Sequence, residues 1–410
     1  MTGHDPTAGP GRTTALLLEG IHPDAAARLV GRGYEVRTSD RALAPDGLAA
    51  ALAGVHLLGI RSKTRVTAGV LAAAGELTAI GAFCIGTDQV DLAAAAAAGV
   101  AVFNAPFSNT RSVVELALAE IIALTRRLTE KNDAMHAGVW DKDAHGSHEV
   151  RGRVLGIVGY GNIGTQLSVL AENLGMGVYF YDTADRLALG NARRCASLDE
   201  LLAVADVVSL HVDGRPGNSG LFGAAQFAAM RPGSLFLNLS RGFVIDHEAL
   251  RAALERGHLA GAAVDVFPAE PAGRGDGFSS SLRGLPNVIL TPHIGGSTQE
   301  AQTDIGAFVA AKLHQFTAEG ATTLCANLPA LALPVPAGTH RLAHVHHNTP
   351  GVLATVDSIL AGYGVNIEGQ LLGTRGGYGY LLTDIGVDYP PEAIGALRAM
   401  PATIRLRVLS

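Results

Sequence analysis

The chain has 410 residues, of which 48% are hydrophobic and 17% are charged, and its formal net charge is −6. This length predicts two or three domains, each able to bury its own core. The charge is mildly acidic and no basic block is present, so we expect no nucleic-acid partner. No apolar run reaches membrane-spanning length, so we expect no membrane partner.

The N-terminal segment and the cysteines favour a cytoplasmic protein. Residues 1–13 are polar and rich in Gly, Pro and Thr, without the apolar stretch of a signal peptide, so we expect a flexible tail. Cys84, Cys195 and Cys325 are far apart and odd in number. Their spacing fits neither a disulfide framework nor a metal site, which is typical of a reducing compartment, and we expect no bound metal.

Short β-like runs alternate with alanine-rich helical stretches in the first part of the chain. The expected strands are 15–18, 57–60, 77–80 and 100–103, and a run of alanines at 93–98 lies in one of the helices. Such alternation predicts a parallel α/β layer. A long amphipathic segment, 112–127, then predicts a connecting helix that leads to the next unit.

The most informative stretch is 154–164, which reads as a buried strand that runs into Gly-x-Gly-x-x-Gly and a helix. Gly159 permits the tight turn, Gly161 lets the backbone approach a pyrophosphate, and Gly164 lets the helix pack on the strand. A second apolar strand, 178–181, ends at Asp182, close to the spacing of about 20 residues expected for a ribose-binding acid. Such a carboxylate accepts the 2′-hydroxyl and repels a 2′-phosphate, which predicts NAD rather than NADP. The plainer alternative is a structural βαβ turn with a surface aspartate.

Three polar residues, Arg241, Glu270 and His293, follow strands of this second unit, whose further strands we expect at 207–211, 234–239, 262–266 and 288–290. Because open parallel sheets bind ligands at the carboxyl ends of their strands, we expect the three side chains to share one site. Oxidation of a 2-hydroxy acid needs a base for the hydroxyl proton and a cation for the carboxylate. Histidine exchanges protons near neutral pH, glutamate orients it, and arginine matches a carboxylate. Taken singly, each residue could instead be structural or a surface charge.

The end of the chain is predicted to be a separate unit. After a helix at 298–316, Pro329, Pro334, Pro336 and Gly338 interrupt the pattern and mark a linker. Beyond it we expect a strand at 341–347, a helix at 351–363, a hairpin around 375–377, a helix at 391–400 and a strand at 404–409. The order β-α-β-β-α-β is the ferredoxin-like arrangement.

Several motifs together resemble those of the D-isomer-specific 2-hydroxyacid dehydrogenases. They are Asn-Leu-Ser-Arg-Gly at 238–242, Val-Asp-Val-Phe-Pro-x-Glu-Pro at 264–271 and Thr-Pro-His-Ile-Gly-Gly-Ser-Thr at 291–298. The resemblance runs from about residue 16 to residue 409. It implies an α/β fold in which a Rossmann-type doubly wound NAD domain (109–297) is inserted in a flavodoxin-like parallel α/β substrate domain (14–108 and 298–335). A C-terminal ferredoxin-like domain of the ACT type (339–410) follows.

The same resemblance implies a role for each candidate residue. His293 accepts the hydroxyl proton in the oxidative direction, Glu270 is its paired acid, and Arg241 anchors the carboxylate and carbonyl of the substrate. NAD is bordered by the glycines of the motif and by Asn162, Ile163, Asp182, Leu239, Ser240, Arg241, Asp265, His293, Ile294, Gly295 and Gly296. The implied reaction is the NAD-dependent oxidation of D-3-phosphoglycerate to 3-phosphohydroxypyruvate, the first step of L-serine biosynthesis.

A phosphorylated substrate needs cations, and the segment 58–64 supplies them after a strand. The resemblance assigns the phosphate to Arg61, Ser62 and Lys63, with Asn109 and with Lys142, near the sole tryptophan, as further candidates. Relatives carry arginine in place of Lys63, and lysine keeps the charge but loses the bidentate fork. A basic loop tip is the plainer alternative.

The C-terminal unit resembles an ACT domain, a small-molecule sensor of amino-acid metabolism. The resemblance implies that His346, Asn348 and Asn366 bind L-serine as a feedback inhibitor across a pair of such domains, and that the protein is a homotetramer. Amide and imidazole groups both donate and accept, which suits the ammonium and carboxylate of serine. A metal site at His344, His346 and His347 is disfavoured because no acidic or cysteine partner follows at ligand spacing. A solvated strand of histidines is the plainest alternative.

Two departures from the family pattern are visible, and two other functions stay open. The linker carries one glycine, Gly338, where relatives have a pair, which predicts a stiffer hinge, and Asp213 stands where the family has proline. The fold and the three polar residues do not separate phosphoglycerate oxidation from the reduction of hydroxypyruvate, glyoxylate or 2-oxoglutarate. A non-enzymatic NAD-sensing regulator on the same fold is the other alternative.

Overall fold

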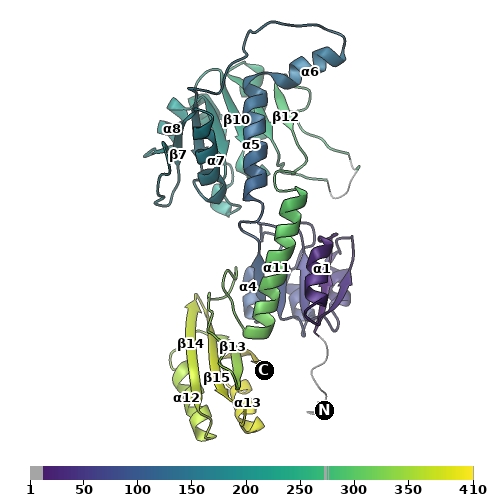
Figure 1. The fold of residues 1–410 in the computed structure, drawn as a ribbon, viewed down its shortest axis with the longest axis vertical. Helices are drawn as coiled ribbons and strands as arrows, with labels where there is room; N and C mark the ends of the chain where they lie inside the picture. The colour runs from purple at the N-terminus through teal and green to yellow at the C-terminus, as the bar shows by residue number, and fades with distance from the viewer. Residues whose placement is uncertain (1–12, 272–274, 276, 410) are drawn as a thin grey trace. The chain divides into compact units, whose positions relative to one another are not determined.

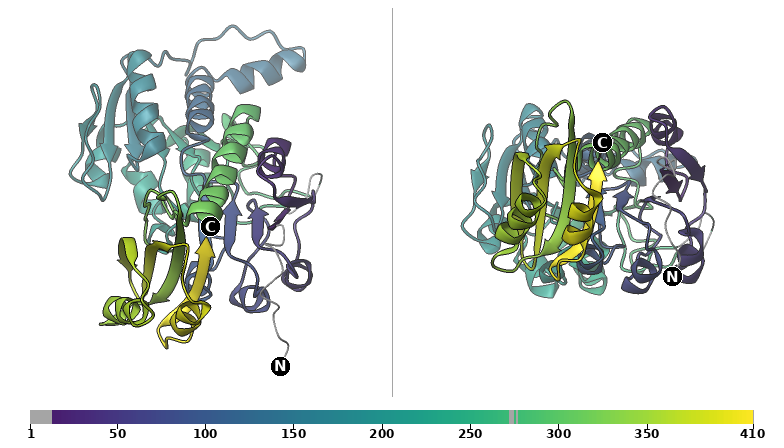
Figure 2. Two further views of the ribbon diagram at one scale, coloured as in Figure 1. Left: turned by 60° about the horizontal axis from the view of Figure 1, so that its bottom comes forward. Right: turned by 90° about the horizontal axis from the view of Figure 1, so that it is seen from below.

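The computed structural model describes residues 13–271, 275 and 277–409, so the tail expected at 1–13 lies almost wholly outside the described residues. The described residues form three β-sheets (Figures 1 and 2). The chain divides into two compact units, Asn109–Ala301 and the segments that precede and follow it. The seven-stranded sheet belongs to the Asn109–Ala301 unit, and the five-stranded and four-stranded sheets belong to the other.

Five short strands form a parallel sheet in the order β2-β1-β3-β4-β5, which is the flavodoxin-like order predicted. They are β1 (Thr14–Leu17), β2 (Glu35–Thr38), β3 (Leu57–Ile60), β4 (Ala79–Ala82) and β5 (Ala101–Asn104). Helices α1 (Pro23–Val30), α2 (Pro45–Ala51), α3 (Ala68–Ala73) and α4 (Leu92–Ala97) connect them. The long helix α11 (Gln299–Glu319) packs Val309 and Leu313 directly over Gly81 of β4, where a Cβ would clash with them.

Two features of this sheet differ from the sequence prediction. Strand β2 was not expected, because it is a largely exposed edge strand with polar residues and no apolar run. Strand β4 begins two residues later than predicted, because Leu77 donates its backbone N–H to Ala74 and so belongs to the turn that follows α3.

The Asn109–Ala301 unit contains a parallel sheet in the order β12-β11-β10-β9-β6-β7-β8. Its strands are β6 (Val154–Val158), β7 (Gly177–Tyr181), β8 (Arg193–Arg194), β9 (Val207–Leu210), β10 (Ser234–Asn238), β11 (Leu259–Val264) and β12 (Val288–Leu290). Its helices are α5 (Thr110–Thr125), α6 (Leu128–His136), α7 (Asn162–Asn173), α8 (Leu198–Val204), α9 (Ala224–Ala229) and α10 (His247–Glu255).

This is the doubly wound Rossmann arrangement that the sequence predicted. Helices α5 and α7 pack together in one buried apolar cluster, and α8, α9 and α10 pack in another, so the sheet is covered on both faces (Figure 1). The strand order reverses between β6 and β9. Such a switch point leaves a crevice beyond the carboxyl ends of the strands, which positions a ligand site there.

The C-terminal sheet is antiparallel, in the order β14-β15-β13-β16, and it has the predicted ferredoxin-like topology. Its elements are β13 (Thr339–His347), α12 (Val352–Gly362), β14 (Ile367–Arg375), β15 (Tyr378–Gly386), α13 (Pro391–Arg398) and β16 (Thr403–Leu409). The hairpin falls at 376–377, as expected.

Alternate residues of β13 face two different apolar cores. Leu342 packs with α12 and α13, whereas Ala343 and Val345 share a core with Phe103 and Phe316 from the five-stranded sheet and α11. This alternation follows from the period of two in a strand. The C-terminal sheet is therefore sandwiched between its own helices and the preceding α/β layer.

A buried ion pair fixes the linker that precedes this sheet. Arg341 is 1% exposed and donates to both carboxylate oxygens of Asp384, at 2.6 and 2.7 Å. Its remaining donors reach the carbonyl oxygens of Glu319, Leu333 and Pro334 at 2.6 to 2.9 Å. The end of α11 and the linker are thereby tied to β13 and β15. Over the part of the chain that the structure describes, no helix is long and apolar enough to cross a membrane.

Candidate active site

The glycine-rich turn between β6 and α7 has the shape of a phosphate cradle. Gly159 has a φ of +92°, and a Cβ there would lie 2.6 Å from the carbonyl oxygen of His211. A Cβ on Gly164 would lie 2.3 Å from the carbonyl oxygen of Gly159, so α7 packs directly on the turn. A Cβ on Gly161 would meet no described atom within 4 Å. The open space beside Gly161 faces the free N–H groups and positive end of α7, which suits a pyrophosphate.

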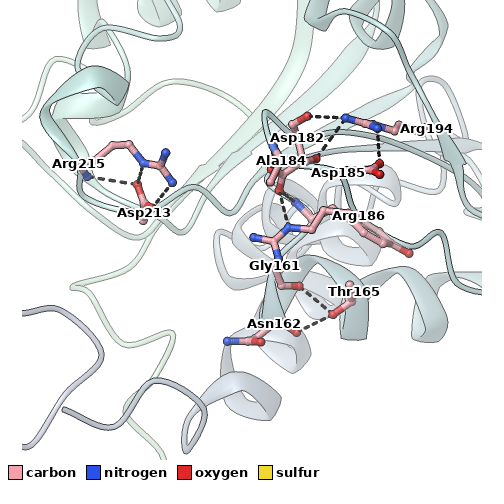
Figure 3. Close-up of polar contacts among 11 residues, drawn as sticks. Gly161, Asn162, Thr165, Asp182, Ala184, Asp185, Arg186, Arg194, Asp213 and Arg215 are labelled. Atoms are coloured by element: carbon pink, nitrogen blue, oxygen red, sulfur yellow. Dashed lines mark hydrogen bonds and ion pairs between the residues drawn. The ribbon is translucent and has the colours of Figure 1, made fainter. Parts of the chain in front are cut away.

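Asp182 directly follows β7 and is hydrogen-bonded to this turn (Figure 3). Its Oδ2 accepts the backbone N–H of Tyr160 at 2.8 Å, and its Oδ1 accepts that of Ala184 at 2.8 Å. The Nε of Arg186 lies 3.6 Å from Oδ2. Tyr160 is itself immobilised, because its ring stacks on Phe180 with the centroids 3.8 Å apart. Each carboxylate oxygen keeps further acceptor capacity, so the geometry is compatible with the predicted role of Asp182 as an acceptor for ribose hydroxyls.

Asp265 shapes the loop that carries His293. It is buried directly after β11 and accepts the hydroxyl of Thr291 at 2.6 Å and the N–H groups of Ile294 and Gly295 at 2.8 and 2.9 Å. Its carbonyl accepts the N–H of His293 at 2.8 Å. These bonds hold His293 at a φ of +56°, a left-handed conformation that is uncommon for a residue with a Cβ. Such backbone strain is typical of functional sites.

His293 and Glu270 form a half-exposed pair. The Nδ1 of His293 lies 3.0 and 2.9 Å from the two carboxylate oxygens of Glu270, and Oε1 also accepts the N–H of Phe267 at 3.1 Å. Because a carboxylate only accepts, Nδ1 carries a proton and Nε2 is left as the basic ring nitrogen. The hydrogen bond to Glu270 raises the pKa of His293 against the opposing effect of burial. Burial alone would raise the pKa of Glu270, but the hydrogen bond and the charge of His293 outweigh burial and lower this pKa.

Arg241 follows β10 at the start of a short 3-10 turn, Gly242–Val244. Asn238 fastens this turn, because its Nδ2 donates to the Arg241 carbonyl at 3.0 Å and its Oδ1 accepts the hydroxyl of Ser240 at 2.7 Å. A Cβ on Gly242 would lie 2.0 Å from the carbonyl carbon of Phe267, so this turn abuts the segment that leads to Glu270. The Arg241 guanidinium lies close enough to act electrostatically on Glu270 and His293.

The described residues fit a dinucleotide. The glycine cradle and Asp182 lie after β6 and β7, and the Arg241, Glu270 and His293 side chains lie after β10, β11 and β12 of the same parallel sheet. Of the other predicted border residues, Asn162 and Ile163 begin α7, and the rest lie in the loops after β10, β11 and β12; these are Leu239, Ser240, Asp265, Ile294, Gly295 and Gly296. The arrangement offers an anion site at one end and an acid–base pair with a guanidinium at the other.

The predicted phosphate residues form a capped turn after β3, which we call the basic turn (residues 61–64). The carboxylate of Glu19 accepts the backbone N–H groups of Arg61, Lys63 and Thr64 at 3.2, 3.0 and 2.8 Å. Thr64 is buried, whereas Ser62 and Lys63 are exposed. The backbone of the turn is therefore held in place, with Ser62 and Lys63 at its surface and Arg61 partly buried.

The two further phosphate candidates lie elsewhere. Asn109 belongs to the Asn109–Ala301 unit, and a Cβ on Gly296 would lie 2.0 Å from its Nδ2. Asn109 therefore packs against the loop that follows His293. Lys142 lies in an exposed loop with its Nζ 5.9 Å from the ring centroid of Trp140, which is 73% exposed.

Strand register separates the predicted effector residues within one copy of the chain. His346 lies opposite Gly379 on β15, whereas Ile367, which directly follows Asn366, lies opposite Ile385 at the other end of β15. Asn348, two residues beyond His346, lies near the same end of β15 as His346. The three side chains therefore do not converge within one copy, and a site made of all three needs a second domain.

Two histidines of β13, His344 and His346, are buried, and each makes a hydrogen bond through one ring nitrogen. His344 and His346 are each 2% exposed, so the alternative of a solvated strand is wrong for them. Thr403 donates its hydroxyl to the carbonyl of Leu397, so the Nε2 of His344, 2.8 Å away, must donate to that hydroxyl. Burial lowers the pKa of His344 to about 4. His346 donates from Nδ1 to the carbonyl of His347 at 2.8 Å.

Sequence reasoning missed two groups of residues near these sites. Glu19 caps the basic turn, and its place at the end of a parallel strand was a signal that could have found it. The Asp213–Arg215 pair follows β9 at the switch point, with Arg215 Nη2 2.6 Å from Asp213 Oδ2. The departure from proline at 213 was the available signal there.

Comparisons with known proteins agree with this geometry. Residues 118–295 match the family model of the D-isomer specific 2-hydroxyacid dehydrogenase, NAD binding domain, and residues 342–405 match that of the AHAS small subunit-like ACT domain. The D-3-phosphoglycerate dehydrogenase of Escherichia coli (strain K12) is 50% identical over 397 residues, covering 96% of this chain and 97% of the relative. That of Haemophilus influenzae is 49% identical over 395 residues, covering 96% of each.

Solved structures show the same architecture. The D-lactate dehydrogenase from Aquifex aeolicus, complexed with NAD and lactic acid, superposes with a TM-score of 0.66 at 25% identity, covering 74% of this chain and 95% of that one. The alignment with the Escherichia coli relative covers 96% of this chain, so it includes the dinucleotide unit and the C-terminal sheet. The chain therefore belongs to the D-3-phosphoglycerate dehydrogenases, within the family of NAD-binding D-isomer specific 2-hydroxyacid dehydrogenases.

Proposed function

We propose that this chain oxidises D-3-phosphoglycerate to 3-phosphohydroxypyruvate, with NAD as the hydride acceptor. The observation that carries the proposal is half-identity over nearly the whole chain to relatives named for this activity, with the His293–Glu270 pair and Arg241 in place. The reaction is the entry to serine biosynthesis, and its natural location is the cytoplasm.

The side chains divide the chemistry among them. NAD, held by the glycine cradle and Asp182, supplies the acceptor for the hydride from C2. The basic Nε2 of His293 takes the hydroxyl proton, while Glu270 stabilises the imidazolium that results. The planar guanidinium of Arg241 pairs with the substrate's carboxylate and polarises the developing carbonyl. Asp265 fixes the loop, so that little reorganisation accompanies proton transfer.

The basic turn is the proposed anchor for the phosphate of the substrate. Its backbone is already ordered by Glu19, so Arg61, Ser62 and Lys63 present charge and a hydroxyl without loss of loop entropy. A phosphate dianion gains more from these groups than an uncharged hydroxymethyl group does.

The C-terminal ACT-type domain is the proposed site of feedback inhibition by L-serine. Since His346 and Asn366 lie at opposite ends of the sheet, the effector site would combine His346 and Asn348 of one copy with Asn366 of another. Pairing of these domains is consistent with a homotetramer. Titration of the activity with L-serine, together with sedimentation analysis, tests both statements, and the Asn366→Ala variant should lose serine inhibition while keeping its basal rate.

An initial-rate assay tests the function and separates the alternatives. NADH formation is measured with NAD and D-3-phosphoglycerate, and in parallel with D-glycerate, for the wild type and for Arg61→Ala. We expect Arg61→Ala to raise KM for phosphoglycerate about tenfold and to leave D-glycerate almost unaffected. Arg37→Ala, which removes an exposed, ion-paired arginine of the same unit, is the matched control.

The other outcomes decide against the proposal. Equal effects of Arg61→Ala on the two acids would favour a dehydrogenase for an unphosphorylated acid. NADH binding with no turnover of any 2-hydroxy or 2-oxo acid would favour a sensor.

A further inference from the structure

The loop after β9 holds an ion pair of fixed geometry. Arg215 donates from Nε to Oδ1 of Asp213 at 2.7 Å and from Nη2 to Oδ2 at 2.6 Å. Asn218 braces the same acid, with its Nδ2 2.9 Å from both the carbonyl oxygen and Oδ1 of Asp213. Two carboxylate oxygens thus hold the guanidinium, and Asn218 holds the carboxylate, although the Arg215 side chain is 62% exposed.

This loop borders the dinucleotide crevice. Strands β9 and β6 are neighbours in the sheet, and a Cβ on Gly159 would lie 3.0 Å from the backbone nitrogen of Val212. Figure 3 shows Asp213 and Arg215 on one side and Asp182 with Arg186 on the other, with Gly161 near the middle, below Arg186. Asp182 is close enough to Arg215 to favour the charged form of the guanidinium, after the larger effect of Asp213.

The position of Asp182 determines which part of a dinucleotide would reach Arg215. If the adenosine ribose binds Asp182 and the pyrophosphate binds the turn at Gly161, the adenine base lies on the side of the ribose away from the pyrophosphate. The base must then lie toward one of the two loops that flank this ribose, after β7 or after β9. Both sides carry a restrained arginine, since Arg194 donates to Asp185 and to the carbonyl oxygens of Asp182 and Ala184. Arg215 is the one that follows β9, the strand at the switch point.

The chemistry of the pair favours a flat, neutral partner. Bidentate pairing uses one edge of the guanidinium and offsets its charge with that of Asp213, so an additional phosphate would gain little there. The faces of the guanidinium are not used by this pairing, and arginine stacks on aromatic planes. We propose that Arg215, whose guanidinium plane is fixed by Asp213, stacks on the adenine ring of the cofactor and is a positioning residue for the bound dinucleotide.

Binding measurements test this without turnover. ADP-ribose affinity is measured by calorimetry, and NMN, which lacks adenine, is measured by competition against NADH fluorescence. Arg215→Ala and Arg215→Lys should both weaken ADP-ribose about tenfold, because each loses the stacking plane, and both should leave NMN within about twofold. Arg251→Ala is the matched control, since Arg251 is an exposed arginine of the same unit paired with Glu255 at 2.8 Å.

Three results would overturn the inference. Unchanged ADP-ribose affinity in Arg215→Ala would show that the side chain does not contact the base. Wild-type affinity in Arg215→Lys would show that charge, not the flat guanidinium, matters. Equal loss for ADP-ribose and NMN would place the effect outside the adenine. The inference rests on the proposed use of NAD. If the chain binds NADH but turns over no substrate, the proposed function fails, while the binding test of Arg215 can still be carried out and still decides this inference.

Discussion

Replacement of Glu120 by glutamine should change how stability depends on pH. Glu120 lies on α5 and is 3% exposed, and neither of its carboxylate oxygens has a hydrogen-bond partner among the described residues. Burial, and secondarily the negative charge of Asp265, raise its pKa from an ordinary 4.5 to about 8. The folded chain therefore keeps a proton on Glu120 at neutral pH that the unfolded chain releases.

The sign and size of the effect follow from this difference. Stability from the protonated form is fully present below pH 4.5 and is lost as pH rises toward 8. Each pH unit in this window corresponds to about 1.4 kcal/mol, so the loss at pH 7 is on the order of 3 kcal/mol. Glutamine has nearly the same shape and does not ionise, so Glu120→Gln should gain stability relative to wild type as pH increases.

Thermal and urea unfolding of both proteins between pH 5 and pH 9 measures the effect. The difference in unfolding free energy should grow in favour of Glu120→Gln across this range and level off above about pH 8. Glu115→Gln is the matched control, since Glu115 is an exposed acid on the same helix that pairs with Arg111 at 2.6 Å. Parallel stability curves for wild type and Glu120→Gln would refute the assignment of a neutral, buried acid.

Three further predictions concern the proposed active site. Glu270→Gln should lower kcat about a hundredfold. It should also move the acidic limb of the kcat/KM profile to lower pH, because His293 loses the carboxylate that raises its pKa. An unmoved limb in pH–rate measurements would contradict this pairing. Gly161→Ala should keep the wild-type melting temperature, but its affinity for NADH in fluorescence titrations should fall about tenfold. Gly164→Ala should instead lower the melting temperature, because its Cβ would lie 2.3 Å from a carbonyl oxygen. Glu19→Gln should raise KM for phosphoglycerate about fivefold in steady-state assays with little change in kcat, because the backbone of the basic turn loses charge-assisted hydrogen bonds; an unchanged KM would show that this cap is not needed.

Local chemistry made much of this molecule predictable. The glycine turn and Asp182 are recognisable because steric limits at Gly159 and Gly164 leave few other residues possible. The three sheets follow from apolar runs with helical stretches between them. Strand β2 escaped prediction because its residues are mostly exposed, and hydrophobic patterning carries no signal at a polar edge.

Long-range hydrogen bonding accounts for what the sequence could not predict. Asp265 was predicted to border the cofactor, and the sequence did not reveal that its carboxylate accepts hydrogen bonds from Thr291, Ile294 and Gly295 and shapes the loop of His293. Glu19 caps a turn more than 40 positions away in the chain. No local pattern specifies such pairs, because they arise only when the carboxyl ends of separate strands are assembled at one edge of a sheet.

A crystal structure of this chain with bound NAD tests the central claim most directly. The account predicts ribose hydroxyls within hydrogen-bond distance of the Asp182 carboxylate, the pyrophosphate on the N–H groups at the start of α7, and the nicotinamide beside the Nε2 of His293. A cofactor whose ribose avoids Asp182, or whose nicotinamide lies away from His293, would contradict it.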